Sequence, residues 1–379
     1  MVNLTSGLLG AILLVRHGDR LEFFQDPLTY TPSETTLTPL GTVQAFNQGD
    51  FFRQRYLQPG PNRIDGLNTD LVDINQLIVR ADAAGEGNII FESCIAFLQG
   101  LYPPTTQFST MLANGSTVLG AMGGYQYVPI ESVEPNQDIS LNSFTSCPNF
   151  ELHTSAFYNS PEFLNRAAEA EPFLTQLQPF LGGRDINFTN MFNIFDFVNV
   201  NMIHNASFLQ SLPPTFAAQA YDLGNFHERG VFSDTSASGI GNIAIRTILP
   251  SIFTSLRRIA NSTDPLKFAL NQISYKPFIS LFNITDVPTS SPDVFGIVDY
   301  ASAVALEVRQ PDSGEATVSL TFRNGTTTDA RLLPIFNNQT AVPISQFIST
   351  LSAAAVNNTA QWCTACNQHT LRGCAACTA

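Results

Sequence analysis

The chain has 379 residues, of which 44% are hydrophobic and 13% charged, a composition typical of a folded globular protein rather than a disordered one. Its 31 acidic and 18 basic residues give a net charge of −13, which excludes the basic surface that nucleic acids or anionic membranes attract. No apolar run approaches the roughly 18 residues that span a bilayer. We therefore expect an acidic globular protein with no nucleic-acid partner and no membrane partner.

The N-terminal segment follows the pattern of an α/β protein. Residues 8–15 are continuously apolar, as in a strand buried on both faces of a parallel sheet. Thr38 and Pro39 are typical of an N-cap and a first helical position, and they predict a helix to about residue 56. A strand is expected at 77–79 and a helix at 91–101. This alternation predicts a parallel sheet with helices packed on it.

The region from about 105 to 235 has a different pattern. Apolar residues recur there at helical spacing, and Ser160-Pro161 is a helix start signal, so we expect it to be mainly helical. Alternating apolar residues return at 301–308 and 316–322 and predict two more strands. The simplest organisation is an α/β core formed by 1–105 and 236–379, interrupted by a helical cap at 106–235.

Sequons and cysteines indicate a secreted glycoprotein. Nine Asn-x-Ser/Thr sequons are spread along the chain, at Asn3, Asn114, Asn187, Asn205, Asn261, Asn283, Asn324, Asn338 and Asn357. The six cysteines are Cys94, Cys147, Cys363, Cys366, Cys374 and Cys377. We interpret the last four, two CxxC pairs, as disulfide-forming rather than zinc-binding, with the connectivity left open and Cys94–Cys147 as the remaining pair. The 8–15 run lacks the flanks of a signal peptide, so we expect a mature chain.

Directly after the first strand comes Arg16-His17-Gly18-Asp19-Arg20. Ligands of open α/β sheets bind at the carboxyl ends of strands, and two forked guanidiniums beside an imidazole suit phosphate or carboxylate. We interpret this segment as an anion site. The histidines at 204, 227 and 369 are interpreted as structural.

At this motif the sequence resembles the histidine acid phosphatases, branch 2 of the histidine phosphatase superfamily, whose signature is R-H-G-x-R-x-P. The resemblance continues through 37–41, 97–104, Cys147-Pro148, 300–302 and 322–325, and the Trp362-Cys363 end is similar to fungal secreted members. It implies a phosphoglycerate-mutase-like three-layer α/β core with a mainly parallel sheet and a helical cap. It also implies that His17 is the nucleophile, that Arg16 and Arg20 bind the phosphoryl group, and that no metal or cofactor is needed.

The sequence departs from the family pattern in three places. Glu22 stands where proline is usual, and Ile89 where a further phosphate-binding arginine is expected, with Arg80 matching a structural arginine instead. The family's late His-Asp pair, which protonates the leaving group, aligns with Ser274-Tyr275. The absence of this acid would cost about 10²–10⁴-fold in rate. Replacement acids to consider are Asp19, Glu22, Asp82 and Glu86.

Three functions follow from this pattern. The first is a secreted phosphatase with residual or selective hydrolysis of phosphomonoesters through a phosphohistidine at His17. The second is a catalytically degenerate protein that binds a small anion, phosphate or carboxylate, in the Arg16/His17/Arg20 pocket. The third is a repurposed enzyme acting on a non-phosphate anion. The oligomeric state is left open.

Overall fold

A central sheet organises the molecule. The computed structural model describes residues 7–21, 24–32, 36–84 and 87–377. Strands of the main sheet follow the order β10-β8-β7-β1-β6-β2-β5, with β9 paired to β8. Their bounds are β1 (Leu8–Arg16), β2 (Leu77–Asp82), β5 (Glu131–Val133), β6 (Phe268–Ile273), β7 (Ala303–Arg309), β8 (Thr317–Arg323), β9 (Arg331–Leu333) and β10 (Val342–Pro343). β1, β6, β2 and β5 pair in parallel, whereas β7, β8, β9 and β10 pair antiparallel.

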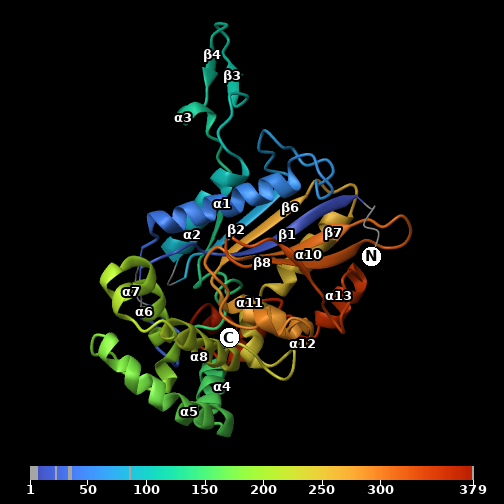
Figure 1. The fold of residues 1–379 in the computed structure, drawn as a ribbon. Helices are drawn as coiled ribbons and strands as arrows, with labels where there is room; N and C mark the ends of the chain where they lie inside the picture. Colours follow the sequence, from blue (N-terminus) through green and yellow to red (C-terminus); the bar gives the residue numbers. More distant parts are fainter. Residues whose placement is uncertain (1–6, 22–23, 33–35, 85–86, 378–379) are drawn as a thin grey trace.

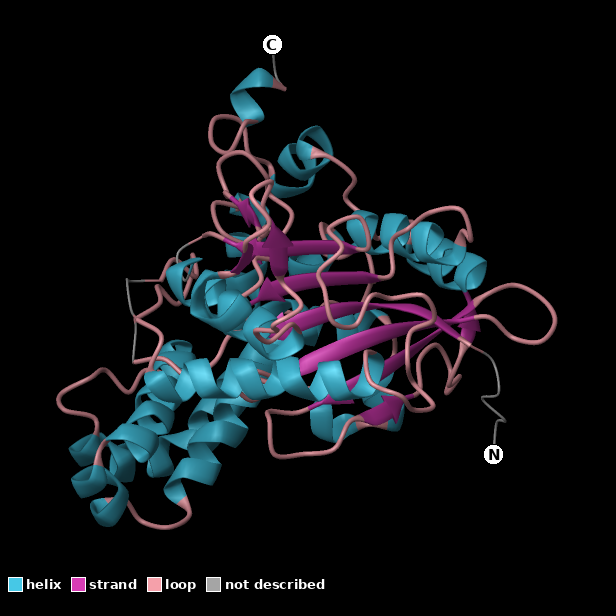
Figure 2. Ribbon diagram, turned by 90° about the horizontal axis from the view of Figure 1, so that it is seen from above, coloured by secondary structure: helices cyan, strands magenta, loops and turns pink. Residues whose placement is uncertain are grey.

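Helices cover both faces of this sheet, as the view from above shows (Figure 2). The longer ones are α1 (Pro39–Tyr56), α2 (Gly87–Leu101), α4 (Pro148–Tyr158), α5 (Pro161–Leu177), α6 (Met191–His204), α8 (Phe216–Val231), α10 (Leu249–Ala260) and α11 (Lys276–Ile284). The shorter ones are α3 (Ala121–Gly124), α7 (Ala206–Ser211), α9 (Ile243–Arg246), α12 (Val287–Ser290), α13 (Ile344–Leu351) and α14 (Thr359–Cys366). Within the described ranges, no helix has the length and hydrophobicity of a membrane span.

Strand β1 is the centre of the core because both of its faces are buried. Leu13 and Val15 pack with the α1 and α2 layer, whereas Ile12 and Leu14 pack with residues of α10 and α11 on the opposite face. Alternate side chains of a strand point to opposite faces, so a continuous apolar run is what a strand between two helical layers requires. The prediction of an α/β protein with a helical region is confirmed.

The middle of the chain is mostly helical, and its helices α4 to α8 form the lower left part of the molecule (Figure 1). Helix α5 begins as the sequence predicts, with the Ser160 side chain accepting a hydrogen bond from the Phe163 N–H. β5 also comes from this region and joins the main sheet beside β2. The proposed domain boundaries at 105/106 and 235/236 therefore stay a prediction, and part of the predicted cap belongs to the sheet.

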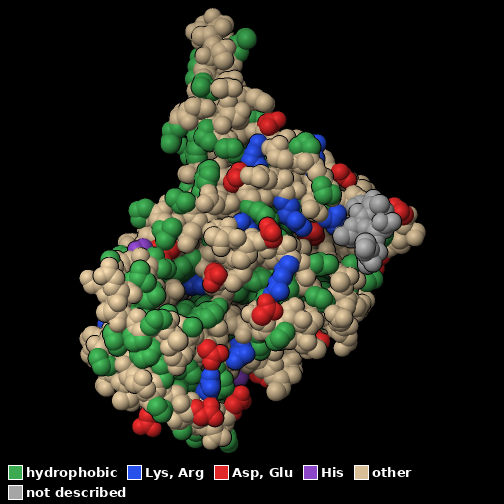
Figure 3. Space-filling model, in the orientation of Figure 1, with side chains coloured by type: hydrophobic (Ala, Val, Ile, Leu, Met, Phe, Trp, Pro, Cys, Tyr) green, Lys and Arg blue, Asp and Glu red, His purple; other side chains and the backbone are tan. Residues whose placement is uncertain are grey.

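A two-stranded arm projects from the body at the top of Figure 1. It consists of β3 (Ser109–Met111), β4 (Thr117–Leu119) and α3, and both strands are exposed along their length. From 93 to 130 the sequence contains no Asp, Glu, Lys or Arg. The space-filling view accordingly shows no charged side chain along the outer part of this arm (Figure 3).

The structure corrects the prediction of six bonded cysteines. The disulfides are Cys147–Cys366 and Cys363–Cys374, and Cys94 and Cys377 form no disulfide. A Cys94–Cys147 pair is wrong because the two residues pack in different core clusters, Cys94 with the α1 and α2 layer. Burial raises the pKa of the Cys94 thiol and keeps it protonated.

Eight of the nine sequons lie in the described residues, and Asn3 lies outside them. Two of the eight are only partly exposed, and each donates within the protein from the amide nitrogen that a glycan would need. Asn283 Nδ2 donates to the Asp234 carbonyl at 2.7 Å, and Asn324 Nδ2 donates to Asp299 at 3.0 Å. The exposed sequons are Asn114, Asn187, Asn205, Asn261, Asn338 and Asn357. We expect modification at these six rather than at Asn283 and Asn324.

Candidate active site

The Arg-His-Gly-Asp-Arg motif leaves the sheet at the carboxyl end of β1. Backbone hydrogen bonds hold it there: the His17 N–H donates to the Ile273 carbonyl and the Ala301 N–H donates to the His17 carbonyl. Gly18 is required by close approach, because a Cβ at this position would lie 2.2 Å from the Gly41 carbonyl oxygen. The motif is therefore fixed between β6, the loop before β7, and the first turn of α1.

His17 is completely buried, and its orientation is set locally. Its Nδ1 lies 2.8 Å from the Gly18 carbonyl oxygen. Because a carbonyl oxygen can only accept, Nδ1 carries the proton in this contact, and the lone pair of the neutral ring is on Nε2. The Tyr300 ring lies beside it, with centroids 5.8 Å apart. The imidazole is thus held in the tautomer that a nucleophile at Nε2 needs.

Arg16 is the motif cation that faces an open cavity. Its guanidinium lies 4.4 Å from the centre of the Tyr300 ring and 5.3 Å from that of Tyr275, and it donates to the Val298 carbonyl oxygen. The side chain is buried, and within the described residues its Nε has no hydrogen-bond partner. This guanidinium keeps donor capacity for an anion.

Arg20, in contrast, forms a buried bidentate ion pair with Asp196 of α6. Its two terminal nitrogens each lie 2.9 Å from one carboxylate oxygen, and both side chains are nearly fully buried. Such a bidentate pair is the geometry that a phosphate would otherwise occupy. The structure therefore brings the two predicted arginines to one place, but α6 supplies an internal anion for the second.

A second contact from α6 reaches the same loop. His204 Nε2 lies 2.7 Å from the buried Asp19 carboxylate, which also accepts a hydrogen bond from Thr38. The Asp19 N–H donates to the Gln44 side chain of α1 at 2.7 Å. His204 is therefore more than the structural residue expected from its sequence context: it joins the helical region to the motif.

Next to the motif, the end of β6 carries the two residues aligned with the family's acid pair. Ser274 is buried, and its hydroxyl has no hydrogen-bond partner in the described part of the chain. The Tyr275 hydroxyl donates to Glu228 Oε2 at 2.5 Å, and Tyr30 donates to Oε1 of the same carboxylate at 2.7 Å. Burial, and then the Glu228 charge, raise the pKa of Tyr30 well above its usual range. This end of the site is closed by packing.

The open part of the site is a cavity of about 390 Å³ between α6, α8 and the loops at 297–300 and 325–327. Arg16 lines it together with Asp299 and Tyr300. Removal from water raises the pKa of the Asp299 carboxyl, and the nearby Arg16 charge acts in the opposite direction. Burial also raises the pKa of Tyr300 to about 12, so its hydroxyl stays protonated.

Comparisons with known proteins show the family and the fold of the chain. A model of the histidine phosphatase superfamily (branch 2) matches residues 18–323. The chain belongs to this family. Lysosomal acid phosphatase of Xenopus laevis is 22% identical over 82% of this chain and 68% of its own length. The phytase of Citrobacter braakii shares the fold, with a TM-score of 0.61 and 13% identity over 92% of this chain and 98% of its own. The Hafnia alvei phytase in complex with tartrate gives a TM-score of 0.60 and 13% identity, over 92% and 97%.

The structure also places the other residues that the sequence analysis compared with the family pattern. Ile89 is buried on α2 and offers no charge. Arg80 is bound by Glu131 and Asp138, at 2.9 and 2.6 Å, which agrees with the structural role expected for it. Asp82 accepts from the Ala84 N–H at the end of β2. Of the other replacement acids considered, Glu22 and Glu86 lie outside the described residues.

A lysine that the sequence analysis did not single out lies at the β6 end. The Lys276 ammonium is buried among the rings of Phe144, Tyr275 and Tyr30, at 4.9, 5.3 and 5.9 Å from their centres. The sequence could have drawn attention to Lys276, because it directly follows the expected acid pair and the chain has only two lysines. Asp196 and Asp299 gave no such signal, since neither belongs to a motif.

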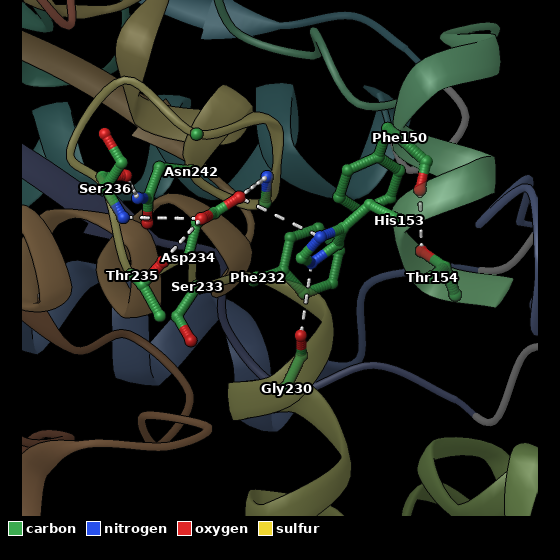
Figure 4. A network of polar contacts seen from close by, with 12 residues as sticks. Phe150, His153, Thr154, Gly230, Phe232, Ser233, Asp234, Thr235, Ser236 and Asn242 are labelled. Atoms are coloured by element: carbon green, nitrogen blue, oxygen red, sulfur yellow. Dashed lines mark hydrogen bonds and ion pairs between the residues drawn. The ribbon is translucent and has the colours of Figure 1, made fainter. Parts of the chain in front are cut away.

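A second histidine–carboxylate pair, His153 and Asp234, lies outside the candidate site (Figure 4). His153 of α4 lies 3.9 Å from Asp234, and its Nε2 lies 3.3 Å from the Gly230 carbonyl. Asp234 also accepts from the Ser236 N–H, which fixes the loop that follows α8. These contacts join α4 to the loop after α8, so we interpret the network as a tie between the helical region and that loop (Figure 4).

Proposed function

We propose that the protein hydrolyses phosphomonoesters through a phosphohistidine at His17. The observation that carries this proposal is the 2.8 Å contact between His17 Nδ1 and the Gly18 carbonyl, which directs the ring's lone pair to Nε2. A nucleophilic Nε2 needs this tautomer, because its lone pair must be free to attack phosphorus. The neighbouring Arg16 guanidinium supplies the positive charge that phosphoryl transfer requires.

The chemistry proceeds in two steps. In the first, Nε2 attacks phosphorus, the bond to the ester oxygen breaks, and the leaving oxygen takes up a proton. In the second, water attacks the phosphohistidine, the phosphorus–nitrogen bond breaks, and phosphate leaves while a proton returns to the acid. Positioning and charge neutralisation dominate such a transfer.

The proton donor of the first step cannot come from the position used by the family. Ser274 is a poor acid, and Tyr275 already donates to Glu228. Asp19 is bound by His204 and Thr38. Asp299 lines the same cavity as Arg16, and its raised pKa favours the protonated form, so it is the donor we assign. Activated esters, which need little protonation, are the favoured substrates.

A second function, anion binding without turnover, is supported by a specific observation. The Asp196 carboxylate already fills the fork of Arg20, and the His17 side chain is completely buried. A protein of this kind would hold phosphate or a carboxylate at Arg16 and release it unchanged. Tartrate, found with the Hafnia alvei phytase, is a carboxylate of this type.

The secretory pathway is the setting we propose. Two disulfides need an oxidising compartment, and six exposed sequons suit a glycoprotein. The relationship to a lysosomal acid phosphatase supports the same setting. Secretion itself is part of the proposal.

Acid-quench mass spectrometry during turnover of p-nitrophenyl phosphate, from about pH 3 to about pH 7, tests the two functions. The hydrolase proposal expects a phosphoryl group on His17, and hydrolysis that is lost in His17→Ala but kept in His369→Ala, the control at an exposed histidine. Equal turnover by wild type and His17→Ala would exclude the phosphohistidine route. Binding of inorganic phosphate without turnover at any pH would favour the second function.

A further inference from the structure

The walls of the cavity beside the motif are mainly apolar. Phe195, Val198 and Met202 of α6 line one side, and Tyr221 of α8 lines another. Arg16 and Tyr300 form the part of the lining that lies beside His17. A ligand with its anionic group at Arg16 would therefore extend its other end over apolar side chains.

The charges in the lining are few. Among the described residues that line the cavity, Arg16 is the only Lys or Arg and Asp299 the only Asp or Glu. The cavity has a volume of about 390 Å³, within the size range of sites for small organic molecules. One cation can neutralise one phosphate, but it cannot compensate several phosphates on one ring, and Asp299 repels further anions.

A buried tyrosine hydroxyl gives a second polar contact at the same end. Tyr300 is 7% exposed, and its hydroxyl has no hydrogen-bond partner among the described residues. Buried hydroxyls are nearly always paired, so the unpaired hydroxyl of a residue that lines the cavity is suited to donate to a ligand at this end. Because its pKa is about 12, it remains a donor throughout the acidic and neutral range.

We propose that this cavity selects phosphomonoesters with a single phosphate and an apolar, aromatic-sized body. The phosphate lies against Arg16 and the Tyr300 hydroxyl, and the body packs between α6 and α8. This rests on the proposed function, because the phosphate must reach His17. It excludes inositol polyphosphates as good substrates of this chain.

Calorimetric binding of three ligands to the His17→Ala protein, which cannot form a phosphohistidine, tests this selectivity. The ligands are 1-naphthyl phosphate, glycerol 2-phosphate and myo-inositol hexakisphosphate. We expect the naphthyl ester to bind at least about 10-fold more tightly than the other two, since apolar contacts are worth about 10–200-fold per small group. Equal affinity for naphthyl and glycerol esters, or tighter binding of the hexakisphosphate, would overturn the proposal.

A variant of the wall gives the matched comparison. Met202→Gln keeps the length of the side chain but adds a polar group to the cavity, so naphthyl phosphate should bind about 10-fold more weakly while glycerol 2-phosphate is unchanged. Leu209→Gln, at an exposed position of α7 that does not line the cavity, is the control. Equal weakening of both esters by Met202→Gln would contradict the proposed packing.

The two proposals fail in different ways. Selective binding of naphthyl phosphate without phosphohistidine in the wild type would sustain the cavity proposal and reject hydrolysis. Phosphohistidine formed from naphthyl and glycerol esters with the same kcat/KM would sustain hydrolysis and reject the selectivity. If none of the three ligands binds, the selectivity proposal is rejected.

Discussion

Two neighbouring strands end differently at the centre of this molecule. β1 and β6 pair in parallel, with Arg16 opposite Ile273, so their carboxyl ends lie together. The β1 end keeps the family's arginines and its histidine. The β6 end carries Ser274, Tyr275 and Lys276 where the family's acid pair is expected. The two strand ends therefore differ: the first carries the Arg-His-Gly-Asp-Arg motif, and the second carries residues that are not acids.

The contacts of each end explain how this is possible. Backbone hydrogen bonds and the close approach of Gly18 to Gly41 leave the β1 loop little freedom. Side chains after β6 extend instead into an aromatic cluster around Glu228, where the Tyr275 hydroxyl completes a buried network. Replacement of the acid pair leaves the sheet intact because the residues concerned follow the strand.

The largest expected effect is on activity, and it distinguishes the carboxyl end of β1 from that of β6. His17→Ala should lower the kcat/KM for p-nitrophenyl phosphate by about 10⁴-fold or more, because it removes the nucleophile. Ser274→Ala should change it less than about 3-fold, because the serine is not assigned a role in proton transfer. Steady-state kinetics of both variants checks this. A large loss in Ser274→Ala would show that the β6 end still takes part.

Asp196→Asn tests whether the second arginine can be returned to ligand binding. The change leaves the buried Arg20 charge without its ionic partner, so we expect a loss of about 3 kcal/mol in the free energy of unfolding. Added phosphate should then raise the Tm of the variant more than that of the wild type. Asp222→Asn removes an exposed pair with Arg166 and should cost less than about 1 kcal/mol. An equal phosphate effect on variant and wild type would contradict the role given to Asp196.

The variant Asp299→Asn tests whether Asp299 is the proton donor of the first step. A raised pKa means that the carboxyl stays protonated to a higher pH, so hydrolysis should fall as pH rises through that pKa. The variant should lose this pH dependence and about 10²-fold in kcat for an alkyl phosphate, but much less for p-nitrophenyl phosphate. An unchanged pH profile with both esters would assign the proton to another group.

Tyr275→Phe should give the smallest effect. We expect it to change the free energy of unfolding rather than the rate of hydrolysis. It removes one donor from the buried Glu228 carboxylate, which should cost about 1–3 kcal/mol in urea unfolding. The kcat should stay within about 3-fold of wild type, since the hydroxyl is not the assigned acid. Tyr127→Phe, at an exposed ring between α3 and β5, is the control. A loss of kcat without loss of stability would move Tyr275 into the chemistry.

The N-terminal part of the fold could be predicted from sequence because its signals are local. The apolar run of β1 and the Thr38-Pro39 start of α1 each lie within one element. The ion pair and the disulfide that could not be predicted join residues far apart in the sequence. Arg20 meets Asp196 across 176 positions, and Cys147 meets Cys366 across 219. No rule of sequence spacing predicts contacts between such distant residues. The incorrect prediction of a Cys94–Cys147 disulfide has the same cause.

The position of β1 also has a consequence for biosynthesis. Its hydrogen-bonding neighbours are β6 and β7, which begin at Phe268 and Ala303, so β1 is made well before the strands with which it pairs. At about 5–20 residues per second, tens of seconds pass between synthesis of this apolar segment and synthesis of the strands that pair with it. Pairing across so large a sequence separation slows folding, because a long loop must close before the strands can contact each other.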